Sequence, residues 1–144
     1  MKVSRILVSL LIPASMMIVS GCSNPFSDLF GSPTTPSSTT STTDTFNGTL
    51  APNGSLVFTF SVTTAGSVAI TLTAVSPATT ASLGLGVGPS SNGNCTIANS
   101  TSGAIAAGSP QLSAMENPGS YCVKVSDAGS LTATSTVTVT VAHP

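Results

Sequence analysis

Few side chains in this sequence could carry catalytic chemistry: there is one histidine, and there are four carboxylates. A hydrolytic triad needs a histidine that takes up the proton of the nucleophile, with a carboxylate behind the imidazole to orient it. The histidine is His143, one residue from the end of the sequence, where a backbone usually frays. We therefore expect His143 to be a solvent-facing tail residue without a catalytic role.

A pair of carboxylates is the second route to chemistry, because two of them can act as acid and base on a glycosidic bond. Asp28 and Asp44 lie within or at the end of a segment rich in serine, threonine and proline, whereas Glu116 and Asp127 flank predicted turns. Turn formation explains these last two residues as well as catalysis would. The sequence predicts no catalytic residue, and we expect the protein not to be an enzyme.

The glycines and cysteines do not indicate a phosphate or metal site. Gly84, Gly86 and Gly88 alternate along a predicted strand and do not join a strand to a helix, so we interpret them as a face that another segment approaches closely. Two thiolates with only His143 elsewhere cannot complete the tetrahedral shell of zinc. No metal and no cofactor are expected.

The start of the chain has the pattern of an export signal. Lys2 and Arg5 form a basic leader, and residues 6–19 are an uncharged, largely apolar run. This length is typical of a secretory signal and falls short of the roughly twenty residues that a membrane-spanning helix needs. We predict that residues 1–21 are a signal peptide.

The signal ends at residues 19–22, which read Val-Ser-Gly-Cys. This segment resembles the bacterial lipobox, and the resemblance implies cleavage between Gly21 and Cys22 and a diacylglyceryl thioether on Cys22. The alternative is an ordinary secretory signal that a cysteine happens to follow. Ser23, in place of Asp, implies the outer membrane under enterobacterial-type sorting. The expected location is the cell envelope with a lipid anchor in the membrane, on a periplasmic or surface face that the sequence leaves open.

The other two cysteines, Cys95 and Cys122, are predicted to form a disulfide, because an exported protein folds in an oxidising compartment. Closing this loop should contribute roughly 3 kcal/mol to stability. Cys122 alternates with Tyr121 and Val123, so we expect the bridge at an edge or on the outer face of the fold.

Charge excludes one class of partner. Without residues 1–21, the chain keeps Lys124 as its single Lys or Arg against four carboxylates, a formal charge of −3. This is too little positive charge to hold a phosphate backbone, so nucleic-acid binding is not expected.

The remaining chain divides into two parts. Residues 22–43 are the predicted lipidated cysteine and a tether rich in Ser, Thr and Pro, which lacks the apolar residues needed for a core. Residues 44–144 alternate apolar and polar residues with a period of two, and turn residues separate the runs. The clearest runs cover residues 56–62, 68–73, 83–88, 121–125 and 136–141, and weaker ones cover 45–50, 95–98 and 111–115.

About eight short strands and no amphipathic helix predict an all-β fold, an antiparallel β-sandwich of jelly-roll-like or immunoglobulin-like form, of which we favour the jelly roll. Phe58, Phe60 and Tyr121 should be the largest residues of its core.

Residues 46–142 resemble the bacterial pre-peptidase C-terminal domain. The matching segments are 46–50, 56–62 with Gly66, 83–87, 118–125 and 138–141. The resemblance implies a jelly-roll-like sandwich with an accessory role in secretion, solubility, or binding of polysaccharide or protein. Where that family often has aspartates before the strand at Leu83, this chain has Thr80-Ala81-Ser82, so an inherited calcium site is not supported.

These features predict a membrane-anchored envelope lipoprotein that presents a non-catalytic binding or adhesion module, with an envelope protein or polysaccharide as partner. The alternative is a structural or assembly accessory to another secreted or envelope protein, and a hydrolase is the least favoured reading. The threonine rows 71/73 and 136/138/140 could contact sugars or an ordered surface, but threonine is also simply a good strand former.

Overall fold

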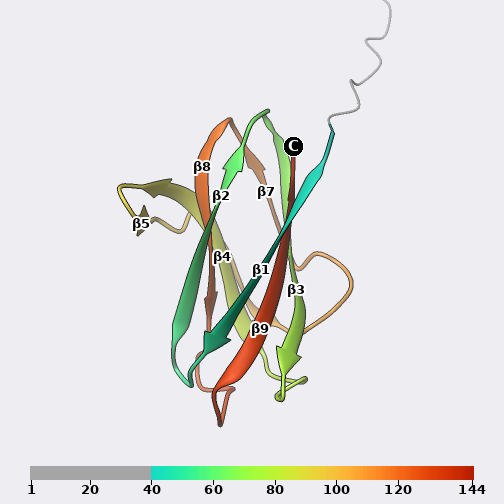
Figure 1. Ribbon diagram of the computed structural model, residues 1–144, viewed down its shortest axis with the longest axis vertical. Helices are drawn as coiled ribbons and strands as arrows, with labels where there is room; N and C mark the ends of the chain where they lie inside the picture. Colours follow the sequence, from blue (N-terminus) through green and yellow to red (C-terminus); the bar gives the residue numbers. More distant parts are fainter. Residues whose placement is uncertain (1–39) are drawn as a thin grey trace, which may run out of the picture. The chain divides into compact units, whose positions relative to one another are not determined.

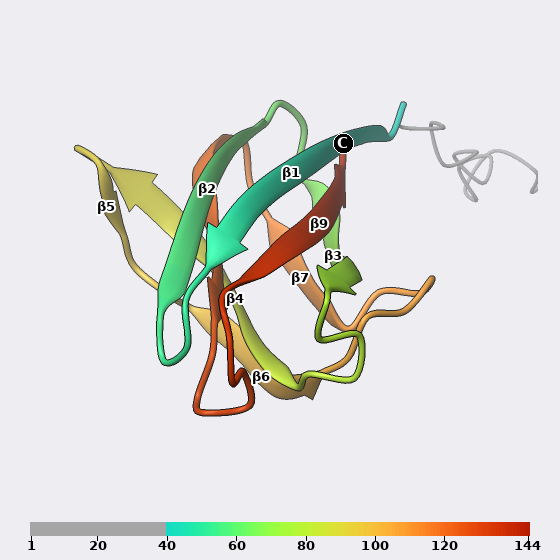
Figure 2. The same ribbon diagram turned by 60° about the horizontal axis from the view of Figure 1, so that its bottom comes forward.

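The computed structural model describes residues 40–144, and these form two antiparallel sheets packed face to face (Figures 1 and 2). The predicted signal peptide, Cys22 and most of the predicted tether lie outside the described residues. β1 begins at Thr42, two residues before the predicted domain boundary, because Thr42 already pairs with His143 of the last strand.

The described residues contain nine strands. They are β1 Thr42–Leu50, β2 Ser55–Val62, β3 Gly66–Ser76, β4 Leu83–Ser91, β5 Asn94–Cys95, β6 Asn99–Ala104, β7 Leu112–Glu116, β8 Gly119–Ser126 and β9 Ser135–His143. Seven of the eight predicted strands are present, and β6 was not predicted. The weak strand predicted at 95–98 overlaps the two-residue β5 only at Cys95, because the chain leaves the regular ladder at residues 96–98. Between residues 40 and 144 no helix is long and apolar enough to cross a membrane.

The strand order is that of a jelly roll. One sheet has the order β1-β9-β3-β7, and the other has β2-β8-β4, with both β5 and β6 paired to β4. Apart from the two-residue β5, each sheet has four strands, and the chain changes sheet at every connection except that from β4 to β6. The predicted jelly-roll-like sandwich is confirmed.

Alternate side chains of both sheets fill the core. Val137, Val139 and Val141 of β9 and Val123 and Val125 of β8 are fully buried, because β8 and β9 are interior strands of their sheets. Burial of such rows of valine supplies the main driving force for packing the two layers.

The prediction for the aromatic residues was right for two of the three. Phe60 and Tyr121 are buried, with ring centroids 5.9 Å apart. Phe58 is only partly buried and stacks on Phe46 at 5.2 Å. The reason is that Phe46 and Phe58 lie on β1 and β2, the edge strands of the two sheets, where they close the side of the sandwich.

Candidate binding cleft

The glycines of β4 mark the face where the site lies. Leu83, Leu85 and Val87 point into the core, whereas Gly84, Gly86 and Gly88 lie on the outer face of the sheet. A Cβ atom on Gly88 would collide with the carbonyl oxygen of Thr96, and one on Gly86 would lie 3.0 Å from the side chain of Ile97. The predicted close approach over this face is confirmed.

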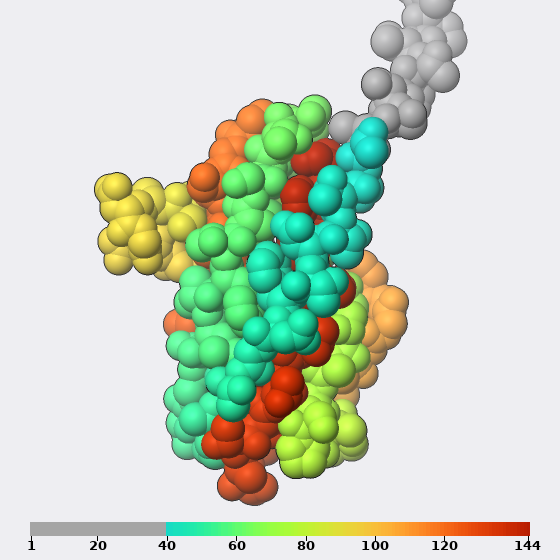
Figure 3. Space-filling model, viewed as in Figure 1, coloured from blue at the N-terminus to red at the C-terminus, as the bar shows by residue number. Residues whose placement is uncertain are grey.

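The segment that approaches is the bulge at residues 96–98, between β5 and β6. The chain first reverses at Asn92 and Gly93, whose φ values of 52° and 78° lie in the left-handed region. It then runs back along β4, with the amide of Thr96 donating to Pro89 and that of Ala98 donating to Val87. The hairpin of β4 and β5 stands out from the body of the molecule (Figure 3).

The predicted disulfide between Cys95 and Cys122 is present, with the two Cα atoms 5.8 Å apart. Cys122 lies opposite Gly88 on β8, outside the core cluster, so the expected position on the outer face is also confirmed. Cys122 is nevertheless fully buried, whereas its partner Cys95 is partly buried. The disulfide thus fastens the bulge to the neighbouring strand.

Beyond the bulge, the outer face of β4 is hollowed into an open cleft of about 860 Å³. Gly84 and Gly86 belong to its floor, Ser126 and Lys124 of β8 stand on one side, and β6 forms the other. The strand register places Lys124, Gly86 and Ser100 in one row across β8, β4 and β6. Because Gly86 has no side chain, the middle of this row accommodates the side chain of Ile97, which lies over it.

The lining of the cleft is polar but carries a single charge. Serine hydroxyls surround it, with Ile97 at one end, and the lining includes no carboxylate. Lys124 is the one Lys or Arg of residues 40–144, it is partly exposed, and no acidic group of those residues lies within salt-bridge distance of it.

Asp127 follows Lys124 closely in sequence, but its carboxylate has other partners. It accepts backbone N–H groups from Asn53 at 2.8 Å, Ser130 at 2.8 Å and Leu131 at 3.1 Å. The hydrogen bond from Asn53, followed by those from the turn, lowers the pKa of Asp127 below its ordinary range, although burial opposes the shift. Asp127 therefore ties the turn after β8 to the turn between β1 and β2.

Glu116 and Asp127 do not form a catalytic pair. Glu116 ends β7 just before β8, and Asp127 follows the last residue of β8. The eight residues of β8 separate them by roughly 26 Å. Glu116 instead lies near Tyr121, whose pKa is raised by burial and then by the charge of Glu116.

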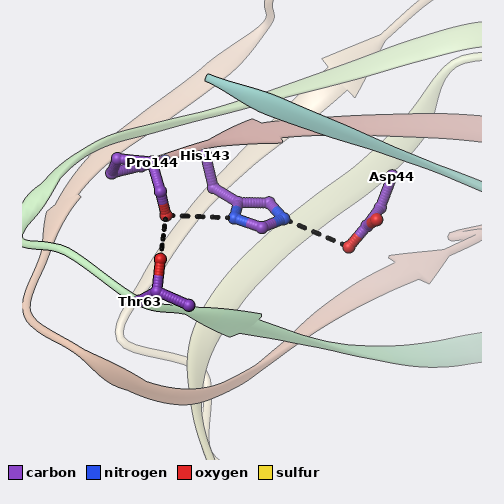
Figure 4. Close-up of polar contacts among 4 residues, drawn as sticks. All are labelled: Asp44, Thr63, His143 and Pro144. Atoms are coloured by element: carbon purple, nitrogen blue, oxygen red, sulfur yellow. Dashed lines mark hydrogen bonds and ion pairs between the residues drawn. The ribbon is translucent and has the colours of Figure 1, made fainter. Parts of the chain in front are cut away.

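The prediction that His143 is a solvent-facing tail residue was wrong. His143 belongs to β9, is only 6% exposed, and places Nε2 3.1 Å from a carboxylate oxygen of Asp44 on β1 (Figure 4). Its ring lies 5.4 Å from that of Phe60. The other ring nitrogen is 3.4 Å from the carbonyl oxygen of Pro144, which also accepts a hydrogen bond from the Thr63 hydroxyl.

His143 is buried because it continues the alternating pattern of β9. Val137, Val139 and Val141 point inward with a period of two, His143 is the next inward position, and pairing with β1 holds the end of β9 in place. Asp44 and His143 supply two parts of a triad, but the hydrogen-bond partners of His143 within residues 40–144 include no serine or cysteine side chain. The pair connects β1 to β9.

The predicted threonine rows lie on the other sheet, away from the cleft. Thr140 is flanked by Thr45 and Thr71, and Thr138 donates to the amide oxygen of Asn47 at 2.7 Å. Thr71 is only 8% exposed, and a β-bulge displaces Thr73 from the row. Part of the array is therefore occupied by contacts within the sheet.

Sequence analysis missed the cleft, because no residue in it belongs to a recognisable motif. The available signal was the alternation of glycine with leucine along β4, followed by the polar stretch 99–103. Nowhere in residues 40–144 do three His, Cys, Asp or Glu side chains come together in a group that could hold a metal ion.

Fold and cleft define a jelly-roll sandwich with a polar, weakly cationic groove on one face. No family model matches the chain, and no curated protein matches it. Among solved structures, the Yersinia pseudotuberculosis-derived mitogen is similar, with a TM-score of 0.50 and 15% sequence identity over 72% of this chain and 86% of that chain. This similarity concerns the fold alone, and the resemblance to the pre-peptidase C-terminal domain stays a prediction.

Proposed function

We propose that this protein is an envelope lipoprotein, anchored through Cys22, that presents its β-sandwich as a non-catalytic binding or adhesion module. The observation that carries the binding role is the cleft on β4, β6 and β8, which is lined by hydroxyls and one ammonium group. Its lining contains no imidazole, carboxylate or thiol that could activate a hydroxyl or transfer a proton. Such a surface is suited to hold a ligand.

The anchor rests on the sequence of residues 19–22 and on the export signal before it. The predicted tether would reach about 70 Å if fully extended, so the sandwich could engage partners well away from the membrane surface. A lipid with several acyl chains holds firmly, because each buried methylene contributes about 0.8 kcal/mol.

The anchor is tested by expressing the full chain with its leader in a Gram-negative host and analysing the mature N-terminus by mass spectrometry. We expect a lipidated Cys22 and recovery in the membrane fraction. Cys22→Ala should abolish lipidation and membrane recovery, whereas the neighbouring Ser23→Ala should leave lipidation unchanged. An unmodified Cys22 thiol on the mature wild-type protein would contradict the proposal.

The binding role is tested by screening the full chain against envelope polysaccharides and, after crosslinking in cells, against envelope proteins. We expect a saturable partner whose binding is reduced by substitutions in the cleft. A screen without any partner at high micromolar concentration would reject the module. Association with one envelope protein that is insensitive to cleft substitutions would favour the assembly role instead.

A further inference from the structure

We infer that the cleft binds a segment of an acidic polysaccharide, with a sugar carboxylate paired to Lys124. This inference rests on the proposed binding function and names its ligand class. It starts from the charge distribution: residues 40–144 carry a formal charge of −2, yet the cleft contains the one Lys or Arg side chain and no carboxylate. The cleft is therefore the part of this surface best suited to a negatively charged group.

The geometry of the row Lys124–Gly86–Ser100 suits a group larger than a single ion. Adjacent strands lie about 4.8 Å apart, so the side chains of Lys124 and Ser100 are anchored roughly 10 Å from one another, and the side chain of Ile97 lies over Gly86 between them. A ligand that spans Ile97 can place an anionic group at Lys124 and reach the hydroxyl of Ser100 at the same time.

The rest of the lining favours a carbohydrate. Ser102 and Ser126 present hydroxyls that can donate or accept, as the hydroxyls of a sugar require, and the Ser130 hydroxyl, which accepts the Ser82 amide at 2.8 Å, can still donate. Ile97 and the glycine floor offer apolar surface to the C–H groups of a sugar ring. The cleft is open to solvent, so a chain can extend out of it away from Ile97.

Other anions fit less well. A nucleic acid presents phosphates every few ångströms and needs several cations, whereas this surface supplies one. A small free anion would depend on Lys124 alone, and a partly exposed ammonium in water attracts it only weakly. A polymer adds hydroxyl and apolar contacts to the single ion pair.

The test measures binding of the full-length protein, purified from its host cells, to oligogalacturonate and to the same oligosaccharide with its carboxylates methyl-esterified. We expect binding of the acidic form, and binding about fivefold weaker for the ester, as expected for loss of one partly exposed ion pair. Lys124→Gln should weaken binding of the acidic form by the same factor and abolish the difference between the two ligands.

Two further variants control for folding and position. Gly86→Ala raises the floor of the cleft against the flexible side chain of Ile97 and should weaken both ligands. Thr49→Ala, at an exposed position of β1 on the opposite sheet, should weaken neither. Cooperative unfolding and an intact disulfide show that each variant is folded.

Equal binding of the acid and the ester by the wild type, or unchanged binding by Lys124→Gln, would overturn the inference. If neither oligosaccharide binds but the wider screen finds a cleft-dependent partner, the ligand class is wrong and the proposed function stands. If no envelope polysaccharide or protein binds at all, both fail.

Discussion

The carboxylate of Asp127 accepts three backbone N–H groups from two different turns. Each of these donors would otherwise need water or another acceptor, and a buried unpaired donor is costly. Asn53 and Gly129 in these turns have left-handed φ values of 58° and 99°, so the carboxylate also holds backbone conformations that few residues adopt readily. Asp127 is therefore a structural residue, although its position next to the cleft resembles that of a functional one.

The lowered pKa of Asp127 gives an acid-dependent prediction. Its contribution to stability is present above the ordinary carboxyl value of 3.8 and is lost as pH falls through the lowered folded value. Asp127→Asn should lower the thermal midpoint at pH 7, and the difference from wild type should shrink below about pH 4. Thermal unfolding followed by circular dichroism from pH 7 to pH 2 measures this, and a difference that stays constant over that range would contradict it.

Tyr121 gives the complementary prediction on the alkaline side. It is the only tyrosine of the chain, so ultraviolet absorbance reports its ionisation alone. Burial and the charge of Glu116 raise its pKa, so the native midpoint should exceed 10.0 and return to about 10 in denaturant. Stability should decrease as pH rises above the unfolded value, because the unfolded chain ionises first. Glu116→Gln should lower the native midpoint, and an unchanged midpoint would exclude the effect of that charge.

Residue roles were predictable where the strand pattern decided them. The Cys95–Cys122 pairing was predicted because two cysteines remain once Cys22 is assigned to the lipid anchor. The outward position of Cys122 was predicted from its alternation with Tyr121 and Val123. His143 was misplaced because its nearness to the chain end was given more weight than the alternation of Val137, Val139 and Val141. Its buried position depends on pairing with β1 about a hundred residues earlier, which no local pattern shows.

At the scale of elements, β4 and the bulge at 96–98 depend on one another. The outer face of β4 must carry glycine where the bulge touches it, and the disulfide of Cys95, next to the bulge, fixes this segment to β8. The same arrangement leaves the cleft open beyond the bulge. The glycines of β4 therefore make room both for the bulge, at Gly88, and for the floor of the cleft, at Gly84 and Gly86.

Gly88→Ala tests this dependence. Its methyl group would collide with the backbone of Thr96, which cannot move aside as a flexible side chain could, so we expect a loss of about 1–3 kcal/mol in unfolding free energy. Gly108→Ala is the matched control, because a Cβ atom there meets nothing within 4 Å. Urea denaturation of both variants provides the comparison, and equal stability of the two would show that the contact at Gly88 is not restrictive.

The disulfide gives a second prediction for this element. The double variant Cys95→Ser with Cys122→Ala removes a link across 27 positions of sequence, and chain-entropy arguments predict a loss of about 3 kcal/mol in unfolding free energy. The effect should appear in urea denaturation and should be matched by wild-type protein under reducing conditions. A loss below about 1 kcal/mol would mean that the bulge is held mainly by its hydrogen bonds to β4.

Elements with regular alternation were predicted, and one without it was not. β6 reads Asn-Ser-Thr-Ser-Gly-Ala, which has no apolar alternation and a single good strand former, Thr101. It is a strand because β4 lies beside it and supplies hydrogen-bond partners, with a register shift between Leu83 and Leu85. Such a strand is imposed by its neighbour, and therefore the cleft wall that it forms could not be predicted either.

At the scale of the whole molecule, the first and last strands close the sandwich. β1 pairs with β9 over all nine of its residues, and its one hydrogen-bonded neighbour in the sheet is β9. The start of β1 and the end of β9 therefore lie side by side (Figure 1). Figure 4 shows the Asp44–His143 contact at this end of the pair.

The adjacent ends predict that the sandwich tolerates a circular permutation. Joining residue 144 to residue 42 through a short glycine linker and opening the exposed loop at Gly108 should give a chain that unfolds cooperatively and forms the same disulfide. Peptide mapping and thermal unfolding would check both properties. A permuted chain that remains unfolded would show that the order in which strands are connected matters beyond their pairing.

The pairing of β1 with β9 also has a consequence for biogenesis. A chain that leaves the ribosome or a translocation pore N-terminus first exposes β1 long before residues 135–143 have emerged. Until then β1 has no strand to pair with, and Asp44 has no imidazole beside it. The sheet that contains β1 can therefore be completed only after residues 135–143 have also emerged.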